Sequence, residues 1–323
     1  MVDLGACEME EIVQAFPEGT HLAFAYGSGA ITQASYNYKN KNSNELPMLD
    51  LIFAVEDAEA WHAENKKRHP MHYTSLVDMN PKYMAWMQNK IGARVWFNTM
   101  VPAGVTSQPD RLMKYGVIDE ANLRKDLMSW DRGLYVAGRL HKPVKLIRSS
   151  PELDFLMEIN RRNAAMTALA LLPRKFDELE LYMTIASLSY TGDPRMAISE
   201  NPNKVANLVT PILPAYRELY KSALGSLDSG LLRTVYLPTA DRTVFVQDDG
   251  AAARSFLLSQ LPRSIQRELP HSRAPLPSVD DTREAVATVV ARAATSQTAM
   301  GLLTAGFAKS AVYAAAKIAK RFK

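Results

Sequence analysis

The hydrophobic pattern of residues 1–148 alternates short helical stretches with apolar strands. Helical periodicity marks three stretches, and runs of consecutive apolar residues mark four strands. The expected helices cover 8–16, 56–67 and 120–130. The expected strands cover 21–26, 48–55, 93–98 and 114–118. This alternation predicts an α+β domain with a mixed sheet that ends near residue 148.

Beyond this domain the pattern becomes mainly helical. Two amphipathic helical stretches and two short strand-like pieces follow one another, and prolines divide the chain between them. They cover 152–172, 176–188, 233–237 and 243–247. The pattern therefore predicts a mainly helical second domain over 149–250.

The C-terminal part has the pattern of a linker followed by a basic tail. Four prolines mark a linker region, 251–281, and residues 282–323 contain seven basic residues against one acidic residue. Apolar residues recur in this tail at spacings of three and four, which predicts a C-terminal amphipathic helix. The candidates for membrane contact on its apolar face are Leu303, Phe307, Ile318 and Phe322. A helix packed on its own domain or on a partner subunit fits the same pattern.

Composition excludes several classes of protein. The chain has 323 residues, 47% hydrophobic and 22% charged, as in soluble globular proteins and unlike polytopic membrane or disordered chains. Its single cysteine, Cys7, excludes an internal disulfide. Because the basic surplus lies in the tail, the body is slightly acidic, which argues against a nucleic-acid partner. The first residues, MVDLGACEMEEIV, have neither a secretory signal nor the arginines of a mitochondrial presequence.

A turn and a carboxylate carry the candidate chemistry. The first strand ends at residues 27–29, Gly-Ser-Gly, where the missing Cβ atoms let the backbone approach a phosphate, although such triplets are more often plain turns. Asp50 interrupts an apolar strand, which is unfavourable unless the carboxylate lies at an open strand end and meets a cation. A turn followed by a strand carboxylate is the layout of nucleotidyltransferases, whose carboxylates hold Mg²⁺. The usual second carboxylate is absent, because Met48 and Ile52 stand two positions away.

Motifs along nearly the whole chain resemble one family, the mitochondrial phosphatidate cytidylyltransferases, which are CDP-diacylglycerol synthases of the translocator assembly and maintenance type. The matching segments are FAYGSGA (24–30), MLDLIFAV (48–55), WHAEN (61–65), HYTSL (72–76), GARVWFN (92–98), KYGVI (114–118), DLMSW (126–130), LYVAGRLHKPVK (134–145), LSYTGDPRM (188–196) and GLLTAGFAKSAVYAAAK (301–317). The resemblance implies that phosphatidic acid attacks the α-phosphate of CTP with Mg²⁺, giving CDP-diacylglycerol and pyrophosphate. It further implies a role in cardiolipin and phosphatidylglycerol synthesis, as a peripheral protein on the matrix side of the mitochondrial inner membrane.

The same resemblance assigns roles to individual residues. Gly27 and Ser28 match the turn that would hold the triphosphate, Asp50 matches the metal ligand, and Lys114 is a further catalytic candidate. Other basic residues of the matching motifs are candidates for phosphate contact, namely Arg139, Lys142 and Lys145. Candidates for substrate contact or for the missing carboxylate are Tyr190, Asp193, Arg195 and Asp126. For the turn at 188–196 an ordinary capped turn is the competing interpretation.

Two other functions remain open from the residues alone. The first is a nucleotidyltransferase that acts on a soluble acceptor, which the acidic body disfavours if the acceptor is RNA. The second is a membrane assembly factor without catalytic activity, in which residues 27–29 are a mere turn. The carboxylate of Asp50 within an apolar strand disfavours this second alternative.

Overall fold

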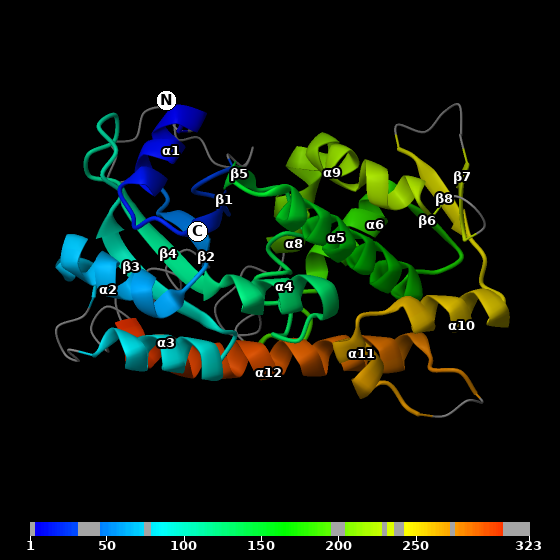
Figure 1. The fold of residues 1–323 in the computed structure, drawn as a ribbon. Helices are drawn as coiled ribbons and strands as arrows, with labels where there is room; N and C mark the ends of the chain where they lie inside the picture. Colours follow the sequence, from blue (N-terminus) through cyan, green and yellow to red (C-terminus); the bar gives the residue numbers. More distant parts are fainter. Residues whose placement is uncertain are drawn as a thin grey trace. The chain divides into compact units, whose positions relative to one another are not determined.

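The protein was analysed as a computed structural model, in which the chain folds into two compact units (Figure 1). The structure describes residues 4–31, 46–73, 79–194, 204–227, 231–235, 242–271 and 275–305, with the backbone alone for 302–305. The first unit comprises Met1–Arg124, Val144–Asp154 and Thr295–Lys323. The second unit comprises Lys125–Pro143 and Phe155–Ala294.

A mixed five-stranded sheet forms the centre of the first unit, with the strand order β3-β4-β2-β1-β5. Its strands are β1 (Thr20–Tyr26), β2 (Leu49–Val55), β3 (Val95–Pro102), β4 (Leu112–Asp119) and β5 (Lys145–Arg148). β2 and β4 run parallel, whereas the other neighbouring strands are antiparallel. The parallel pair needs a crossover connection, which the helices and β3 between the two strands supply.

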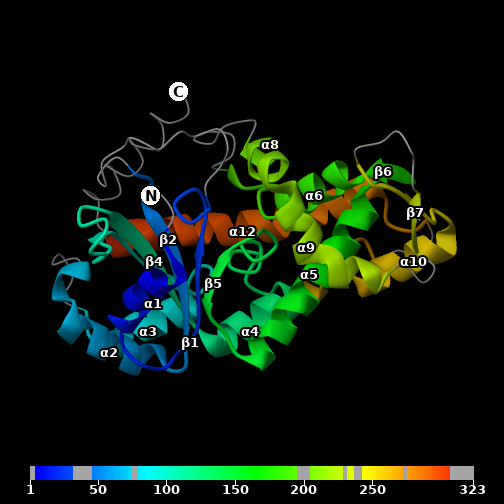
Figure 2. The ribbon, with the colours of Figure 1, turned by 90° about the horizontal axis from the view of Figure 1, so that it is seen from above.

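Helices cover one face of this sheet and form the main core (Figure 2). They are α1 (Ala6–Gln14), α2 (Ala58–Arg68), the short η2 (Pro70–His72) and α3 (Pro81–Lys90). Phe16, which follows α1, packs against Phe53 of β2 at a ring distance of 4.9 Å and against Trp61 of α2 at 6.0 Å. Large aromatic side chains therefore join the helices to the alternate, inward-facing residues of the strands.

The edge strand β3 is held by the end of the long helix α12 (Val279–Ala305). The Gln297 side chain accepts a hydrogen bond from the Ala93 amide and donates one to the Val95 carbonyl, at 2.9 and 3.0 Å. Met300 packs with Trp96 in a small apolar cluster. One residue of α12 thus satisfies two backbone groups at the edge of the sheet, where they would otherwise be unpaired.

The second unit is mainly helical and includes a small antiparallel sheet. Three helices, α4 (Glu120–Ser129), α5 (Pro151–Leu171) and α12, have residues in both units. The other described helices are α6 (Glu178–Ser187), α8 (Lys204–Val209), η3 (Thr210–Ile212), α9 (Leu213–Gly225), α10 (Ala251–Gln260) and α11 (Arg263–Glu268). The small sheet has the order β6-β8-β7, with β6 (Lys175–Asp177), β7 (Leu232–Val235) and β8 (Val244–Gln247).

The α+β class expected from the sequence is confirmed, because a mixed sheet with helices is followed by a mainly helical region. The segment 251–281, which the prolines mark as a linker, contains α10 and α11. Leu303 lies within α12, and its side chain is outside the described part of the chain, as are residues 306–323 with Phe307, Ile318 and Phe322. Among the described residues, no helix is both long and apolar enough to cross a membrane.

Candidate active site

A row of three side chains crosses one face of the sheet in the first unit. Tyr26 of β1 is paired with Asp50 of β2, and Asp50 is paired with Lys114 of β4. Residues that are directly paired in neighbouring strands point to the same face, so the three side chains adjoin. Asp50 is partly exposed, whereas the other residues of β2 are all buried. The carboxylate therefore lies at the open start of its strand, as the sequence predicts.

The Gly-Ser-Gly turn lies directly against this carboxylate. Gly27 has a positive φ of 74°, and a Cβ on this residue would lie only 3.6 Å from Oδ2 of Asp50. Its carbonyl accepts hydrogen bonds from the amides of Ala30 and Ile31, which closes the turn. A Cβ on Gly29 would lie 2.2 Å from a backbone oxygen that precedes β2, so a side chain has no room there. The turn and Asp50 form one local structure.

A buried arginine, which the sequence analysis did not single out, ties this turn to the strands. Arg111 is 1% exposed and comes just before β4. Its Nη2 donates to the carbonyl of Gly29 at 2.5 Å and to that of Pro47 at 3.3 Å, and its Nη1 donates to Gln108. Since hydrogen bonds from a charged donor are stronger than neutral ones, Arg111 holds the turn beside the start of β2.

Two lysines chosen from the motifs are placed differently by the sheet. The ammonium group of Lys114 lies 4.4 Å from the centre of the Phe97 ring, on the face that carries Asp50. Lys145 of β5 is paired with Ala25, so it points to the opposite face. There its Nζ donates to the carbonyl of Leu4 at 3.0 Å, just before α1. The geometry gives Lys145 a role in holding the N-terminal segment.

The second unit gathers cations around an aromatic ring. Lys142 and Lys204 approach the Tyr190 ring, with ammonium groups 4.7 and 4.5 Å from its centre. Lys142 also donates to Oγ of Ser189 at 2.8 Å. Burial, together with the neighbouring charges of Arg139 and Lys204, lowers the pKa of Lys142 well below its usual value. Arg139, Lys142 and Tyr190, which the motifs singled out, thus lie near one another and near a further cation, Lys204.

Local backbone geometry allows these groups to approach one another. A Cβ on Gly138 would lie 2.4 Å from Cβ of Ser189, so only glycine permits this close contact. The Gly138 carbonyl accepts a hydrogen bond from Nζ of Lys142 at 2.6 Å. The Arg139 guanidinium stacks on the ring of Tyr135 at 4.3 Å and donates to its carbonyl. Residues 137–139 therefore serve two purposes: Gly138 allows the close packing, and Arg139 supplies a positive charge.

The candidates for a second carboxylate lie in different settings, Asp126 within helix α4 and Asp193 in the turn after Tyr190. Asp126 is fully buried and accepts hydrogen bonds from the backbone amides of Arg132, Val136 and Ala137. Burial raises the pKa of Asp126, and these three amides act against that increase. Asp193 is also buried, and its amide donates to the Tyr190 carbonyl at 3.1 Å. Arg195 lies outside the described residues. The geometry favours a structural role for Asp126.

Comparison with known proteins identifies the family of this chain. A family described as "Phosphatidate cytidylyltransferase, mitochondrial" matches residues 9–320. The chain belongs to this family. The relative of that name from Mus musculus is 35% identical over 334 residues, which cover 98% of this chain and 94% of its own. The Drosophila melanogaster relative is 37% identical with 96% and 97% coverage, and the Caenorhabditis elegans relative is 33% identical with 98% and 99% coverage.

The family membership confirms the resemblance that the motifs indicated, and it covers both units. Among the described residues, no group of three histidine, cysteine, aspartate or glutamate side chains is arranged to hold a metal ion. Asp50 therefore has no such cluster of acidic partners within the described chain.

Two of the family motifs, WHAEN and HYTSL, meet in a buried polar network on the other face of the sheet. His62 and Asn65 are one helical turn apart on α2, and both are fully buried. Nδ2 of Asn65 donates to the hydroxyls of Tyr73 and Tyr115, both at 2.9 Å. Asn98 of β3 donates to the same Tyr115 hydroxyl at 2.7 Å. The Tyr115 hydroxyl thus joins β3, β4 and α2.

This network supports the strand that carries Lys114. Tyr115 follows Lys114 directly and points to the opposite face, so fixing its ring fixes the backbone at the candidate site. Burial lowers the pKa of His62 to about 4, so the imidazole is neutral at pH 7. Sequence reasoning gave these residues no firm role. Polar side chains at buried positions of an amphipathic helix are the signal that could have found them.

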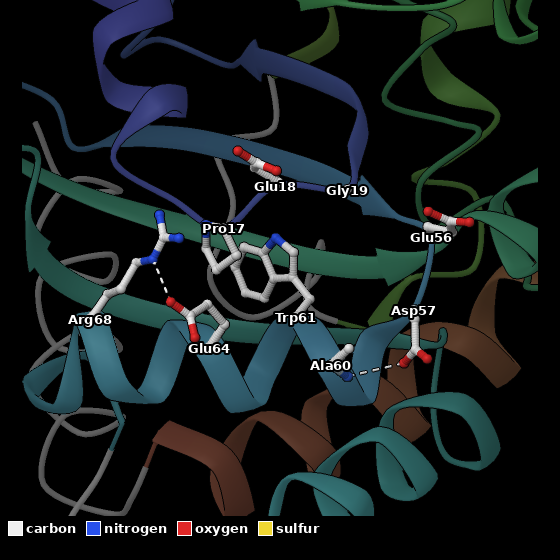
Figure 3. Close-up of a pocket in the computed structure, with 9 residues that line it drawn as sticks. All are labelled: Pro17, Glu18, Gly19, Glu56, Asp57, Ala60, Trp61, Glu64 and Arg68. Atoms are coloured by element: carbon white, nitrogen blue, oxygen red, sulfur yellow. Dashed lines mark hydrogen bonds and ion pairs between the residues drawn. The ribbon is translucent and has the colours of Figure 1, made fainter.

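A separate cavity lies at the other end of the sheet (Figure 3). It has a volume of about 340 Å³ and opens between the start of β1, the end of β2 and helix α2. Its lining residues are Pro17, Glu18, Gly19, Glu56, Asp57, Ala60, Trp61, Glu64 and Arg68. Arg68 is paired with Glu64 at 2.9 Å, and the Asp57 side chain accepts from the Ala60 amide. An acidic lining disfavours a triphosphate, so the candidate site remains at Asp50.

Proposed function

We propose that the chain transfers the cytidylyl group of CTP to phosphatidic acid, which yields CDP-diacylglycerol and pyrophosphate. An oxygen of the phosphatidate phosphate bonds to the α-phosphorus of CTP, while the bond from that phosphorus to the oxygen bridging to the β-phosphate breaks. The contact of the Gly27 turn with Asp50, in a chain that matches the family over residues 9–320, carries this proposal. Its product would supply cardiolipin and phosphatidylglycerol synthesis.

The residues beside the turn fit a magnesium ion. Mg²⁺ in phosphoryl-transfer sites is bound through one or two carboxylates, with substrate phosphates and water as the other ligands. Asp50 supplies one partly exposed carboxylate at a strand end, next to a turn whose backbone can approach a phosphate. When bound there, Mg²⁺ would neutralise charge on the triphosphate and favour departure of pyrophosphate.

The side chains of the first unit then position the nucleotide. Residues Gly27 and Ser28 would offer backbone amides and a hydroxyl to the phosphates. Lys114 would place a cation in the same row as Asp50, where it can balance the negative charge of the transferred phosphate. Arg111 and the Tyr115 network would act indirectly: they hold the turn and strand β4 in place and do not contact the nucleotide themselves.

The cations of the second unit would bind a phosphate group of one of the two substrates. Arg139 and Lys142, with Lys204 added, form a group of like charges, and such a group is stabilised by a bound anion. The Tyr190 ring lies 4.7 and 4.5 Å from the two ammonium groups and would shape this site, with Asp193 and Arg195 as further candidates for substrate contact. We assign no phosphate contact to Lys145, because its ammonium group already donates to Leu4.

The membrane is the source of the lipid substrate, so the chain would act at its surface. The relatives are named as mitochondrial, which supports a mitochondrial place of action, and within the mitochondrion we propose the matrix side of the inner membrane. The apolar face expected over residues 300–322, with Leu303, Phe307, Ile318 and Phe322, would contact anionic lipid. The slightly acidic body supports a lipid rather than a nucleic-acid acceptor.

One assay tests this function. Purified full-length protein is incubated with CTP, Mg²⁺ and vesicles that contain phosphatidic acid, and pyrophosphate and lipid-borne cytidine are measured. Both products should appear in equal amounts, and both should require phosphatidic acid. Pyrophosphate release that depends on a soluble acceptor instead would overturn the lipid assignment. No release with either acceptor would favour an assembly factor without catalytic activity.

A further inference from the structure

Helix α3 has one buried and one exposed face. Met84, Met87 and Gln88 are buried within the first unit, where the two methionines pack in the cluster that includes Met300. The outward face carries a different set of side chains. It consists of Lys82, Tyr83, Trp86 and Lys90, which we call the α3 stripe. At about 100° per residue, these four positions fall within an arc of roughly 100° on the helix.

The aromatic residues of the α3 stripe are unusually exposed. Tyr83 is 52% exposed and Trp86 is 51% exposed, although tryptophan is generally a highly buried residue. Their rings stack on each other, with centres 5.6 Å apart and planes 12° apart. This stacking keeps two large apolar surfaces side by side and facing outward.

Positive charge surrounds the aromatic pair. Lys82 and Lys90 are exposed, and α3 contains no acidic residue. At the start of the helix, Nζ of Lys66 from the last turn of α2 donates to the carbonyl of Met79 at 3.1 Å. The stripe and its surroundings thus combine exposed aromatic rings with basic side chains.

We propose that the α3 stripe is a binding surface for an anionic phospholipid bilayer, separate from the C-terminal tail. Tryptophan and tyrosine favour the membrane interface because their rings are apolar with one polar group, and lysines are attracted to anionic head groups. The choice of a bilayer rather than a protein rests on this charge complementarity and on the proposed function, which requires access to a membrane lipid. The stripe would hold the first unit at the membrane surface.

The four tryptophans of the chain give a direct test. Trp61, Trp96 and Trp130 are buried, so a change in fluorescence on membrane contact reports on Trp86. The full chain is mixed with vesicles of brominated phosphatidylcholine and phosphatidylglycerol, and with vesicles of brominated phosphatidylcholine alone. Emission should shift to the blue and be quenched with the anionic vesicles, and Trp86→Phe should abolish both effects.

Charge and aromatic variants separate the two components of binding. Each lysine removed should weaken vesicle binding by about fivefold, which is about 1 kcal/mol, so Lys82→Glu with Lys90→Glu should weaken it at least tenfold. Phe155→Ala is the matched control, because Phe155 is 65% exposed but is preceded by Asp154 on its helix. This control should bind vesicles as the unchanged chain does. Far-ultraviolet circular dichroism and melting temperature verify that every variant is folded.

Distinct results would overturn this proposal. If the chain co-sediments with anionic vesicles while Trp86 emission stays unchanged, the contact lies elsewhere and the stripe is not a membrane surface. If the Trp86 emission changes with protein concentration in the absence of lipid, the stripe is an interface between copies of the chain. Quenching of Trp86 in a protein that makes no CDP-diacylglycerol would leave the stripe assigned and overturn only the proposed function.

Discussion

The turn at Asp50 and the cation cluster around Tyr190 are built on opposite electrostatic principles. In the first unit the sheet register sets a carboxylate, Asp50, beside a cation, Lys114. In the second unit, turns and side-chain packing bring Lys142, Lys204 and Arg139 together, and like charges share one site. A strand row of opposite charge is stable in the free protein, whereas a cluster of like charges is stabilised by an anion.

This contrast indicates which region binds a metal with phosphate and which binds phosphate alone. A carboxylate attracts a cation, so the region of Asp50 suits metal-bound triphosphate. A group of cations without a metal suits a bare phosphate.

Replacing Asp50 should cause the largest loss. Asp50→Asn keeps the volume of the side chain and removes its charge, so turnover should fall by about 10²- to 10³-fold or more. Pyrophosphate release with CTP, Mg²⁺ and phosphatidate vesicles measures the effect. Asp57→Asn is the matched control, because asparagine can replace aspartate as the N-cap of α2. Normal turnover of Asp50→Asn would contradict the assignment of Asp50 as the magnesium ligand.

Replacing Lys142 should weaken substrate binding without loss of stability. Lys142→Met keeps an unbranched chain and removes a charge that burial and neighbouring cations disfavour. We expect kcat/KM to fall by about 10- to 100-fold, while the melting temperature stays about the same, because removing the disfavoured charge offsets the lost hydrogen bonds to Gly138 and Ser189. Steady-state kinetics and differential scanning fluorimetry measure the two quantities. A lower melting temperature with unchanged kinetics would make Lys142 a structural residue.

The two buried histidines should make both units less stable in acid. Burial lowers the pKa of His62 to about 4 and that of His141 to about 3. Each must stay neutral in the folded chain but takes up a proton below about pH 6.5 when unfolded. Stability is therefore complete above pH 6.5 and falls as the pH decreases towards these values.

Between pH 7.5 and 5 the free energy of unfolding should fall by about 2 kcal/mol for each histidine. Urea unfolding at several pH values measures this change. His62→Asn should reduce the pH dependence in the first unit, and His141→Asn should do so in the second. An unfolding free energy that stays constant over this range would contradict the neutral state of both imidazoles.

Replacing Lys145 should have the smallest effect. Lys145→Met removes one hydrogen bond to the Leu4 carbonyl, so stability should fall by about 1 kcal/mol. CTP affinity, measured by isothermal titration calorimetry, should be unchanged, because the side chain points away from the face of Asp50. If Lys145→Met weakens CTP binding as strongly as Lys142→Met does, Lys145 contacts the nucleotide after all.

The sequence alone was sufficient to predict β1 to β4 of the first unit and the position of its carboxylate, but it did not predict α3 or β5. Apolar runs indicated β1 and β2, and their bounds agree with the structure to within one residue. Local sequence is informative there because a buried strand needs consecutive apolar residues, and a lone aspartate within such a run must lie at an opening. The family motifs, confirmed over residues 9–320, pointed to the chemistry.

Only the tertiary structure decided which basic residues adjoin and which face away. Lys142 and Lys145 are three positions apart in one motif. Lys142 nevertheless joins a cation cluster, whereas Lys145 donates to the Leu4 carbonyl on the face of the first sheet opposite Asp50. The role of Arg111 had no local signal, because the two carbonyls that it ties together, those of Gly29 and Pro47, come from segments more than sixty residues earlier. Strand register and loop closure set these contacts, and both depend on pairing between distant segments that no local pattern encodes.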